Sequence, residues 1–377
     1  MRPTTTESLL RRDRRLHLLA ALATAVAALG CGGPRGGDCA GDALIDGHAS
    51  LTDFVQRGCS SLSGTLRITG GEVTDVTLPA LTAVGTLQVH DATALAHLEL
   101  PALAGAGAIY VQGLPVLASA GLPELTDADA IYVVSNPNLA RLDLPALEQV
   151  RYSLDVERNG ALASLDLPAL SSVGGHLLVA FNGSLASLRL PRLTAVAGTL
   201  VLSDQPLDLL ATPALASVSL LRVESTSLSS LDLPALSTAG VLWIRGNWRL
   251  QAIRLPALQS VAGDLWIFEL LALSSVELPA LTAAGGSVHV SDTGALASLE
   301  LPALATVGGE LSVYANGALS VLDLRALTAV GPMLEIAQNP ALADCRAVAI
   351  KDRLVAEHGY TGDWRITGND AAAVCGP

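Results

Sequence analysis

A tetrapeptide, Leu-Pro-Ala-Leu or a close variant of it, recurs along most of this sequence. Consecutive copies lie 21 to 23 residues apart. A fixed period of this size is typical of a solenoid, in which each repeat forms one coil that stacks on its neighbours. The repeated proline is found at Pro79, Pro101, Pro123, Pro145, Pro168, Pro191, Pro213, Pro234, Pro256, Pro279 and Pro302, and Arg325 takes its place in the twelfth copy.

One repeat, residues 168–190, shows what a coil contains. Leu177 and Val179 alternate with other residues, as do Leu188 and Leu190, and alternation over short runs is strand spacing. Gly-Gly and Asn-Gly pairs mark the turns, and no run has the helical period. The sequence therefore predicts an all-β fold, a single parallel β-solenoid of about 12 coils. At the usual distance between strands its length is about 60 Å.

Six asparagines occupy one column of the repeat, three residues after the second inward residue of a strand. A side-chain amide at this place can bond to the backbone of its own turn and of the next coil. We interpret the column as a structural ladder rather than a ligand site. Its members are Asn136, Asn159, Asn182, Asn247, Asn316 and Asn339.

Composition excludes several classes of function. Half of the residues are hydrophobic, so most of the chain is not disordered. The net charge of −13 argues against a nucleic-acid-binding surface. Seven His and five Cys are too few for many metal sites, and we expect neither metal nor cofactor.

Residues 1–30 have the features of an export signal. Five arginines precede an apolar run that extends from Leu16 to Leu29, and small residues follow. The ending resembles a bacterial lipoprotein signal, which implies cleavage before Cys31, a lipid on Cys31 and a flexible tether over 31–38. The alternatives are an ordinary signal peptide that is cut before any cysteine, and a short anchor that is not cut.

The remaining four cysteines lie in two pairs at the ends of the mature chain. Four cysteines allow three connectivities, and the one that closes local loops is Cys39–Cys59 with Cys345–Cys375. An exported protein meets an oxidising environment, in which disulfides persist. A solenoid also needs caps at its ends. We therefore expect an N-terminal cap over 39–64, the solenoid over 65–343 and a C-terminal cap over 344–377.

The C-terminal cap is expected to contain one short helix. Asp344 is a good N-cap residue, and Gly359 can end a helix that runs to about His358. A last strand near 364–366 would complete the cap.

The coil resembles the receptor L domain, a leucine-rich β-solenoid. The resemblance rests on the segment 59–68, on the Gly-x-Leu-x-Val strands and on pieces such as the Asn-Pro-Asn-Leu at 136–139, and it covers about residues 39–345. Leucine-rich repeats are the near relative. The resemblance implies extracellular recognition with no shared catalytic residues. The sequence has one long array where the receptors have two shorter domains and a kinase, so signalling is not implied.

Two outward columns of the predicted strands hold six of the twelve aromatic residues. Aromatic and arginine side chains are common at recognition surfaces, but aromatic ladders can also simply stabilise a sheet. We expect Tyr110 to stack on Tyr132 and Trp243 on Trp266. The ligand-binding candidates are Tyr110, Tyr132, Trp243, Arg245, Trp266, Phe268, His289 and Tyr314.

The sequence contains no HExxH, GxSxG or P-loop motif. A β-helix polysaccharide lyase or hydrolase would need clustered carboxylates or basic groups, and no such cluster is evident. We therefore expect no enzyme. The expected protein is an exported, lipid-anchored monomer at the outer membrane or cell surface that binds a glycan or a protein. The alternative is a structural envelope spacer that has no ligand.

Overall fold

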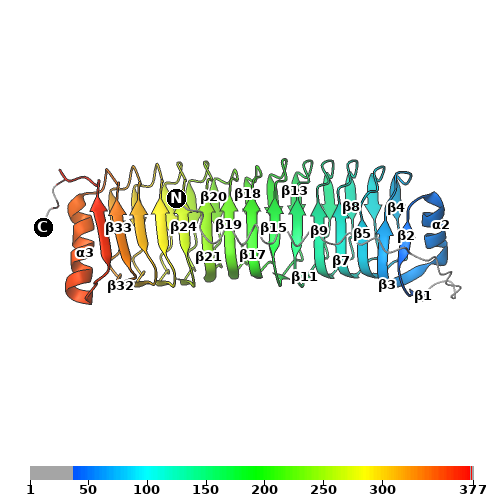
Figure 1. Cartoon of the computed structure of the whole chain (residues 1–377), viewed down its shortest axis with the longest axis horizontal. Coiled ribbons are helices and arrows are strands. Elements are labelled where there is room, and N and C mark those ends of the chain that lie inside the picture. The colour runs from blue at the N-terminus through cyan, green and yellow to red at the C-terminus, as the bar shows by residue number, and fades with distance from the viewer. Residues whose placement is uncertain (1–36, 374, 376–377) are drawn as a thin grey trace. The chain divides into compact units, whose positions relative to one another are not determined.

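The computed structural model describes residues 37–373 and 375, which form a parallel β-solenoid of about 13 turns (Figure 1). This confirms the predicted fold class. The predicted signal segment, the lipid site Cys31 and most of the tether lie outside the described residues. A typical coil has three strands, such as β11 (Gln149–Val150), β12 (Leu154–Glu157) and β13 (Ser164–Asp166). The first two belong to one long sheet, and the third belongs to a separate face.

The long sheet combines short and long strands, because in several coils the first two strands merge into one. Its strands, besides β11 and β12, are β1 (Gly37–Cys39), β2 (Ala43–Ile45), β3 (Cys59–Ile68), β5 (Ala83–Val89), β7 (Gly105–Gln112), β9 (Asp127–Val134), β14 (Ser172–Val173), β15 (Leu177–Ala180), β17 (Ala195–Ser203), β19 (Ser217–Glu224), β21 (Thr238–Arg245), β23 (Ser260–Val261), β24 (Leu265–Phe268), β26 (Ala283–Ala284), β27 (Val288–Ser291), β29 (Thr306–Val307), β30 (Leu311–Tyr314), β32 (Ala329–Val330), β33 (Met333–Ala337) and β34 (Asp363–Thr367).

The other face consists of three-residue strands in three groups. The groups are β4 (Asp75–Thr77), β6 (His97–Glu99), β8 (Ser119–Gly121) and β10 (Arg141–Asp143), then β13, β16 (Ser187–Arg189) and β18 (Leu209–Ala211), then β20 (Ser230–Asp232), β22 (Ala252–Arg254), β25 (Ser275–Glu277), β28 (Ser298–Glu300) and β31 (Val321–Asp323).

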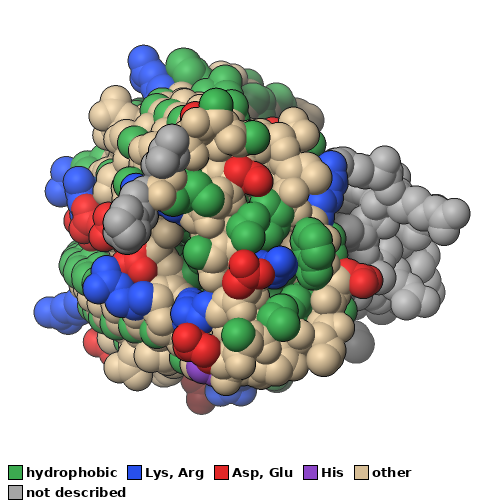
Figure 2. Space-filling view, turned by 90° about the vertical axis from the view of Figure 1, so that its left-hand side faces the viewer, with side chains coloured by type: hydrophobic (Ala, Val, Ile, Leu, Met, Phe, Trp, Pro, Cys, Tyr) green, Lys and Arg blue, Asp and Glu red, His purple; other side chains and the backbone are tan. Residues whose placement is uncertain are grey.

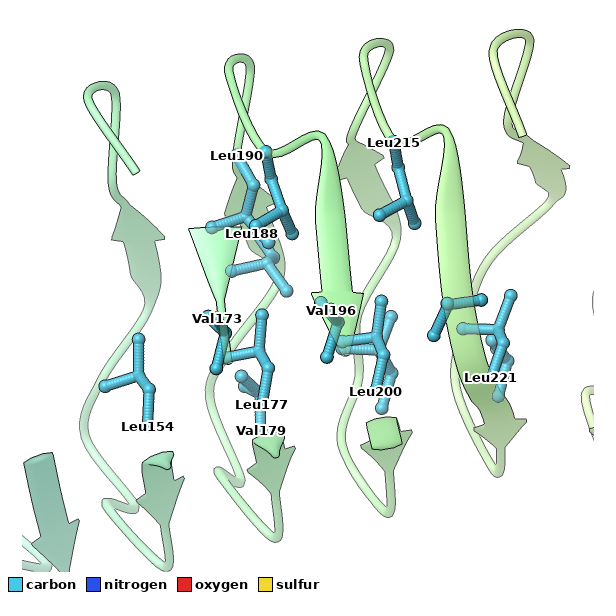
Figure 3. Packing of buried hydrophobic residues seen from close by; sticks show 14 of the residues in the cluster. Leu154, Val173, Leu177, Val179, Leu188, Leu190, Val196, Leu200, Leu215 and Leu221 are labelled. Atoms are coloured by element: carbon cyan, nitrogen blue, oxygen red, sulfur yellow. The ribbon is translucent and has the colours of Figure 1, made fainter. Parts of the chain in front are cut away.

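Equivalent residues of successive coils pair in parallel register. Leu154 of β12 pairs with Leu177 of β15, which pairs with Leu200 of β17. Because side chains alternate along a strand, each such column is wholly inward or wholly outward. The inward columns of Leu, Val and Ile are almost completely buried, and Figure 3 shows them pointing into the interior of the coils. No coil can bury these residues alone, so neighbouring coils stabilise each other.

The repeated tetrapeptide forms a β-turn. In the coil of β13, the backbone N–H of Leu170 donates to the carbonyl of Leu167 at 3.3 Å, and Pro168 lies between them. Proline is favoured at this second position because its fixed φ suits the turn and its missing N–H is not needed. Both leucines are buried. The tetrapeptide therefore turns the chain while it fills the core.

A second corner, after the middle strand of each coil, holds the backbone in the left-handed region. The conformation recurs at non-glycine residues, including Arg158 (φ 53°) and Phe181 (φ 57°). A non-glycine residue there costs about 1–2 kcal/mol. The residue that follows this corner belongs to the asparagine column.

The asparagine column is fully buried and hydrogen-bonded between coils. Asn159 Nδ2 donates to the carbonyl of Val133 at 2.9 Å, and Asn159 Oδ1 accepts from the N–H of Asn136 at 3.2 Å. These bonds reach back to the preceding coil, whereas we expected bonds to the residue's own turn and to the next coil. Asn247 alone also donates to its own turn, at the carbonyl of Arg245. Sequence analysis missed four further members of this column, Gln205, Thr226, Thr293 and Asn369.

The N-terminal cap contains a helix that the sequence did not lead us to expect, α2 (His48–Arg57). It places Phe54 in the core and ends at Gly58, which has a φ of 63°. The helix is short and lies between glycine-rich segments, so its pattern was too brief to recognise. The disulfide Cys39–Cys59 joins β1 to β3 beside it, as predicted.

The C-terminal cap is built from α3 (Asp344–His358) and β34. Helix α3 ends before Gly359, as predicted, but Asp344 is its first residue rather than its N-cap. Arg353 donates to the carbonyls of Leu324 and Leu327, so the helix supplies hydrogen bonds to the last tetrapeptide turn. The structure also contains the disulfide Cys345–Cys375. Figure 2 looks onto this end, where charged side chains interrupt the hydrophobic ones.

Candidate functional site

The candidate aromatic residues near the C-terminal half lie side by side on the outward face of the long sheet. Trp243 of β21 pairs with Trp266 of β24, which pairs with His289 of β27. The ring centroids of Trp243 and Trp266 are 5.4 Å apart with a tilt of 40°. The imidazole of His289 stacks on Trp266 at 3.7 Å and 15°. Trp266 is therefore covered by a ring on each side along the column.

Phe268 closes this cluster from the neighbouring outward column. Its ring meets Trp243 edge to face at 5.0 Å and lies 5.9 Å from Trp266. The guanidinium of Arg245 lies 5.3 Å from the centroid of Phe268. We call Trp243, Trp266, Phe268 and His289 the tryptophan cluster. Its rings are half-buried, so part of each ring is accessible to a partner.

Ion pairs border the tryptophan cluster. Arg245 Nε lies 2.8 Å from Glu269 Oε2, and Arg245 Nη1 lies 3.7 Å from Glu224 Oε1. Glu224 also accepts from Arg222, the residue beside Trp243 in its column. The indole Nε1 of Trp243 is buried and has no hydrogen bond within the described part of the chain. The border of the tryptophan cluster is therefore made of ion-paired side chains, and its centre contains one hydrogen-bond donor, the indole N–H of Trp243, that has no acceptor among the described residues.

The surroundings of His289 favour the neutral form of its imidazole. Burial lowers its pKa, against the opposing effects of the Asp264 and Glu335 carboxylates. A neutral imidazole suits its place against an indole ring, because stacking there does not require a charge to leave water.

The remaining candidates lie apart from the tryptophan cluster. Tyr314 is in the column of Phe268, but Ser291 separates the two. Arg365 of β34 lies 5.8 Å from the Tyr314 ring. Tyr110 and Tyr132 stack at 5.0 Å and 8°, on β7 and β9. Strands β12, β15, β17 and β19 lie between that pair and Trp243.

Asp155 is a further residue of interest beside the tyrosine pair, and the sequence did not lead us to expect a ligand-binding role for it. It lies beside Tyr132 in the outward column. Burial, and secondarily the charge of Glu157, raise the pKa of Asp155 to about 7. Desolvation also raises the pKa of Tyr132, with contributions from Asp155 and Tyr110 and an opposing hydrogen bond from Ser153. The alternation of the strand places Asp155 outward, but only the structure shows that it is partly buried.

The outward columns form a shallow surface rather than a pocket. Two hollows of about 220 and 360 Å³ lie elsewhere, one lined by residues such as Asp129 and Arg151 and the other by residues such as Glu277 and Glu300. Glu277 lies beside Glu300 of the adjacent strand, and an ion pair with Arg254 at 3.4 Å compensates the charge of Glu277. Across residues 37–373 and 375, no group of three or more His, Cys, Asp or Glu side chains could hold a metal ion. None of the helices described is long and apolar enough to cross a membrane.

No protein-family model matches the chain, and no curated protein matches it significantly. The resemblance to the receptor L domain therefore stays a prediction. Among solved structures, the functional domain of InlJ from Listeria monocytogenes, which includes a cysteine ladder, is 15% identical, with 79% of this chain and 74% of that chain covered and a TM-score of 0.20.

Two other solved structures are similarly distant. A leucine-rich repeat protein from Bacteroides ovatus is 12% identical, with 69% of this chain and 87% of that one covered and a TM-score of 0.20. A TLR13–ssRNA13 complex is 14% identical, with 88% and 72% covered and a TM-score of 0.18. These values carry no argument about function, which has to be made from this chain's own residues.

Proposed function

We propose that this protein is an exported, lipid-anchored surface protein that binds a glycan or a protein partner, without covalent chemistry, through the outward face of its long sheet. The observation that carries the proposal is the tryptophan cluster. A chain with only 3% aromatic residues concentrates two of its four tryptophans, with Phe268 and His289, on three adjacent strands of one face.

The composition of this surface supports recognition. Tryptophan and arginine are enriched among the residues that dominate binding energy, especially where a polar border surrounds an apolar centre. The tryptophan cluster has such a border in Arg222, Glu224, Arg245 and Glu269. The free Nε1 of Trp243 could donate to a hydroxyl or a carbonyl of the partner after a small movement of the ring.

The double variant Trp243→Ala/Trp266→Ala should lose binding. We expect at least a tenfold weaker affinity for any ligand found by screening the purified protein against arrayed glycans and envelope fractions. Trp248→Ala is the matched control, because Trp248 lies on the same coil but at the exposed turn. Circular dichroism would verify that both variants fold. Equal affinity in the double variant and the wild type would move the site to another face.

A second function, that of a rigid spacer without a ligand, has one specific observation in its favour. Both faces of the Trp266 ring are already covered, by Trp243 and His289, and the two tyrosine rings cover each other. Such stacking stabilises a parallel sheet whether or not anything binds. Failure to detect any ligand in the screen would favour this function.

The anchor is tested separately from the binding surface. Mass spectrometry of the mature protein should find an N-terminal Cys31 that carries two or three acyl chains. A Cys31→Ala variant should lose the lipid and leave the membrane fraction. An unmodified N-terminus further along the chain would contradict lipid anchoring without affecting the binding proposal.

A further inference from the structure

A second place on the outward face, at the tyrosine pair, has the chemistry of a cation site. Asp155 lies next to Tyr132 along the sheet, and Tyr132 stacks on Tyr110. Oxygen Oδ1 of Asp155 is buried and accepts no hydrogen bond from any residue within 37–373 and 375. A buried carboxylate oxygen without a partner costs free energy that a donor from a bound molecule would recover.

The other carboxylates of the two outward columns are already compensated. Each of them has an arginine partner. Arg158 Nη1 lies 3.3 Å from Glu157 Oε2, and Arg365 Nη1 lies 2.9 Å from Glu335 Oε1. Glu224 accepts a hydrogen bond from Arg222 Nε. In the described part of the chain, Asp155 has no such ion pair. The fold therefore leaves one carboxylate of this face available, and that one is beside an aromatic ladder.

The groups around Asp155 favour a cation over other ligands. Glu157 lies on its own strand, Tyr132 faces it from β9, and Leu178 faces it from β15, which has no ionisable side chain; His176 precedes that strand. The neighbouring Arg158 forms its ion pair with Glu157, and within residues 37–373 and 375 no Lys or Arg forms an ion pair with Asp155. Carboxylate and tyrosine together bind ammonium and guanidinium groups, by charge and by the negative ring face.

The surface beyond Asp155 is apolar. Leu178 and Val201, which are half-buried, continue its column before Arg222 begins the charged border of the tryptophan cluster. Ala180 and Ser203, which continue the column of Glu157, are buried and leave this surface to Leu178 and Val201. A free polyamine would leave this apolar stretch uncovered, whereas a polypeptide could lay apolar side chains on it. The net charge of the chain also favours a positively charged partner, because residues 37–377 contain 33 acidic and 16 basic side chains.

We propose that Asp155, with Tyr132 beside it, binds an arginine or lysine side chain of a protein partner whose neighbouring apolar residues cover Leu178 and Val201. This inference deepens the proposed function by assigning a second contact on the same face, four strands from Trp243. At the usual distance between strands this is about 19 Å, so one partner segment can reach both contacts.

Hexa-arginine, titrated calorimetrically into the purified protein at low salt, tests the proposal. At pH 8 the Asp155→Asn variant should bind about tenfold more weakly than the wild type. The matched control is Asp166→Asn, which removes the same charge from the same coil on the other face. It should change the affinity less than twofold. Equal losses in both variants would overturn the proposal, because they would reflect only the net charge.

Acidity provides a second readout. The pKa of Asp155 is raised to about 7, so at pH 5.5 its carboxyl holds a proton that a cation must displace. Wild-type affinity should therefore fall about tenfold between pH 8 and 5.5, and the Asp155→Asn variant should lack this fall. A pH dependence that persists in the variant would exclude Asp155 as the anchor.

Two further arms separate the possible ligands. Hexa-citrulline has the same shape without charge and should not bind. Spermine should bind weakly and without sensitivity to Leu178→Ser, whereas hexa-arginine binding should weaken in that variant. Tight spermine binding that depends on Asp155 would identify the ligand as a polyamine and would overturn the proposal of a protein partner. The two proposals can fail separately. If the Trp243→Ala/Trp266→Ala variant loses the screened ligand but Asp155→Asn binds hexa-arginine as the wild type does, the cation site is wrong and the proposed function stands. If the double variant keeps the screened ligand but Asp155→Asn loses hexa-arginine, the tryptophan cluster is not the binding surface and the cation site stands.

Discussion

Replacing Asn159 with alanine should lower the free energy of unfolding by roughly 3–5 kcal/mol. The side-chain amide of Asn159 serves three buried groups of the preceding coil, namely the carbonyl of Val133 and the backbone N–H and side-chain amide of Asn136. Alanine cannot replace these bonds, and the side chains of this column have no exposed surface. Urea denaturation followed by circular dichroism would measure the loss.

Asn138→Ala is the control for this prediction. Asn138 is exposed, two residues from the column, and donates one bond to the carbonyl of Pro115 at 2.6 Å. Water can replace that bond, so the expected loss is below about 1 kcal/mol. Similar losses in the two variants would show that the buried ladder contributes no more than an ordinary surface bond.

Asp155→Asn should stabilise the protein at alkaline pH, by roughly 2–4 kcal/mol at pH 8. In the folded chain the pKa of Asp155 is raised from 3.8 to about 7, chiefly by burial. Below pH 3.8 the carboxyl is protonated in both states and costs nothing. As the pH rises towards 7 the unfolded chain ionises first, so the wild type loses stability over this range. Above pH 7 the loss is complete.

The difference between variant and wild type should therefore grow between about pH 4 and 7 and then remain constant. Denaturant midpoints measured at pH 4.5, 6 and 8 would follow it. Asp166→Asn, on the exposed strand β13 of the same coil, should change stability by less than about 0.5 kcal/mol at each pH. A difference that shrinks as the pH rises would mean that Asp155 is stabilised in its charged form.

The solenoid could be predicted from the sequence because the pattern that determines one coil recurs in almost every repeat. Each coil repeats the Leu-Pro-Ala-Leu turn and the inward leucines, so the period and the alternation report the same structure many times. Helix α2 occurs once, has no repeated pattern and was missed. Asn369 was missed for a similar reason, since the insertion of α3 places it 30 residues after Asn339 instead of 23 or so.

The candidate site could be predicted in part. Alternation and register placed Trp243 beside Trp266 and Tyr110 beside Tyr132, because columns depend only on backbone pairing. The tilt of the rings, the T-shaped contact of Phe268 and the cover of His289 over Trp266 depend on rotamers, which a pattern does not contain. The burial of Asp155 depends on the size of its neighbours across the sheet. The ring geometry and the burial of Asp155 are both properties of packing, which only the folded structure shows.

The direction of the asparagine bonds has a consequence for how the chain can assemble. The side chain of Asn159 satisfies the coil before it, and its own backbone N–H is satisfied by Asn182 of the coil after it. Addition of coils from the N-terminal end therefore brings the Asn159 side chain onto a coil that is already present. The backbone N–H of Asn159 then waits only for the next coil, which carries Asn182, so this part of the column forms without the reopening of an earlier coil.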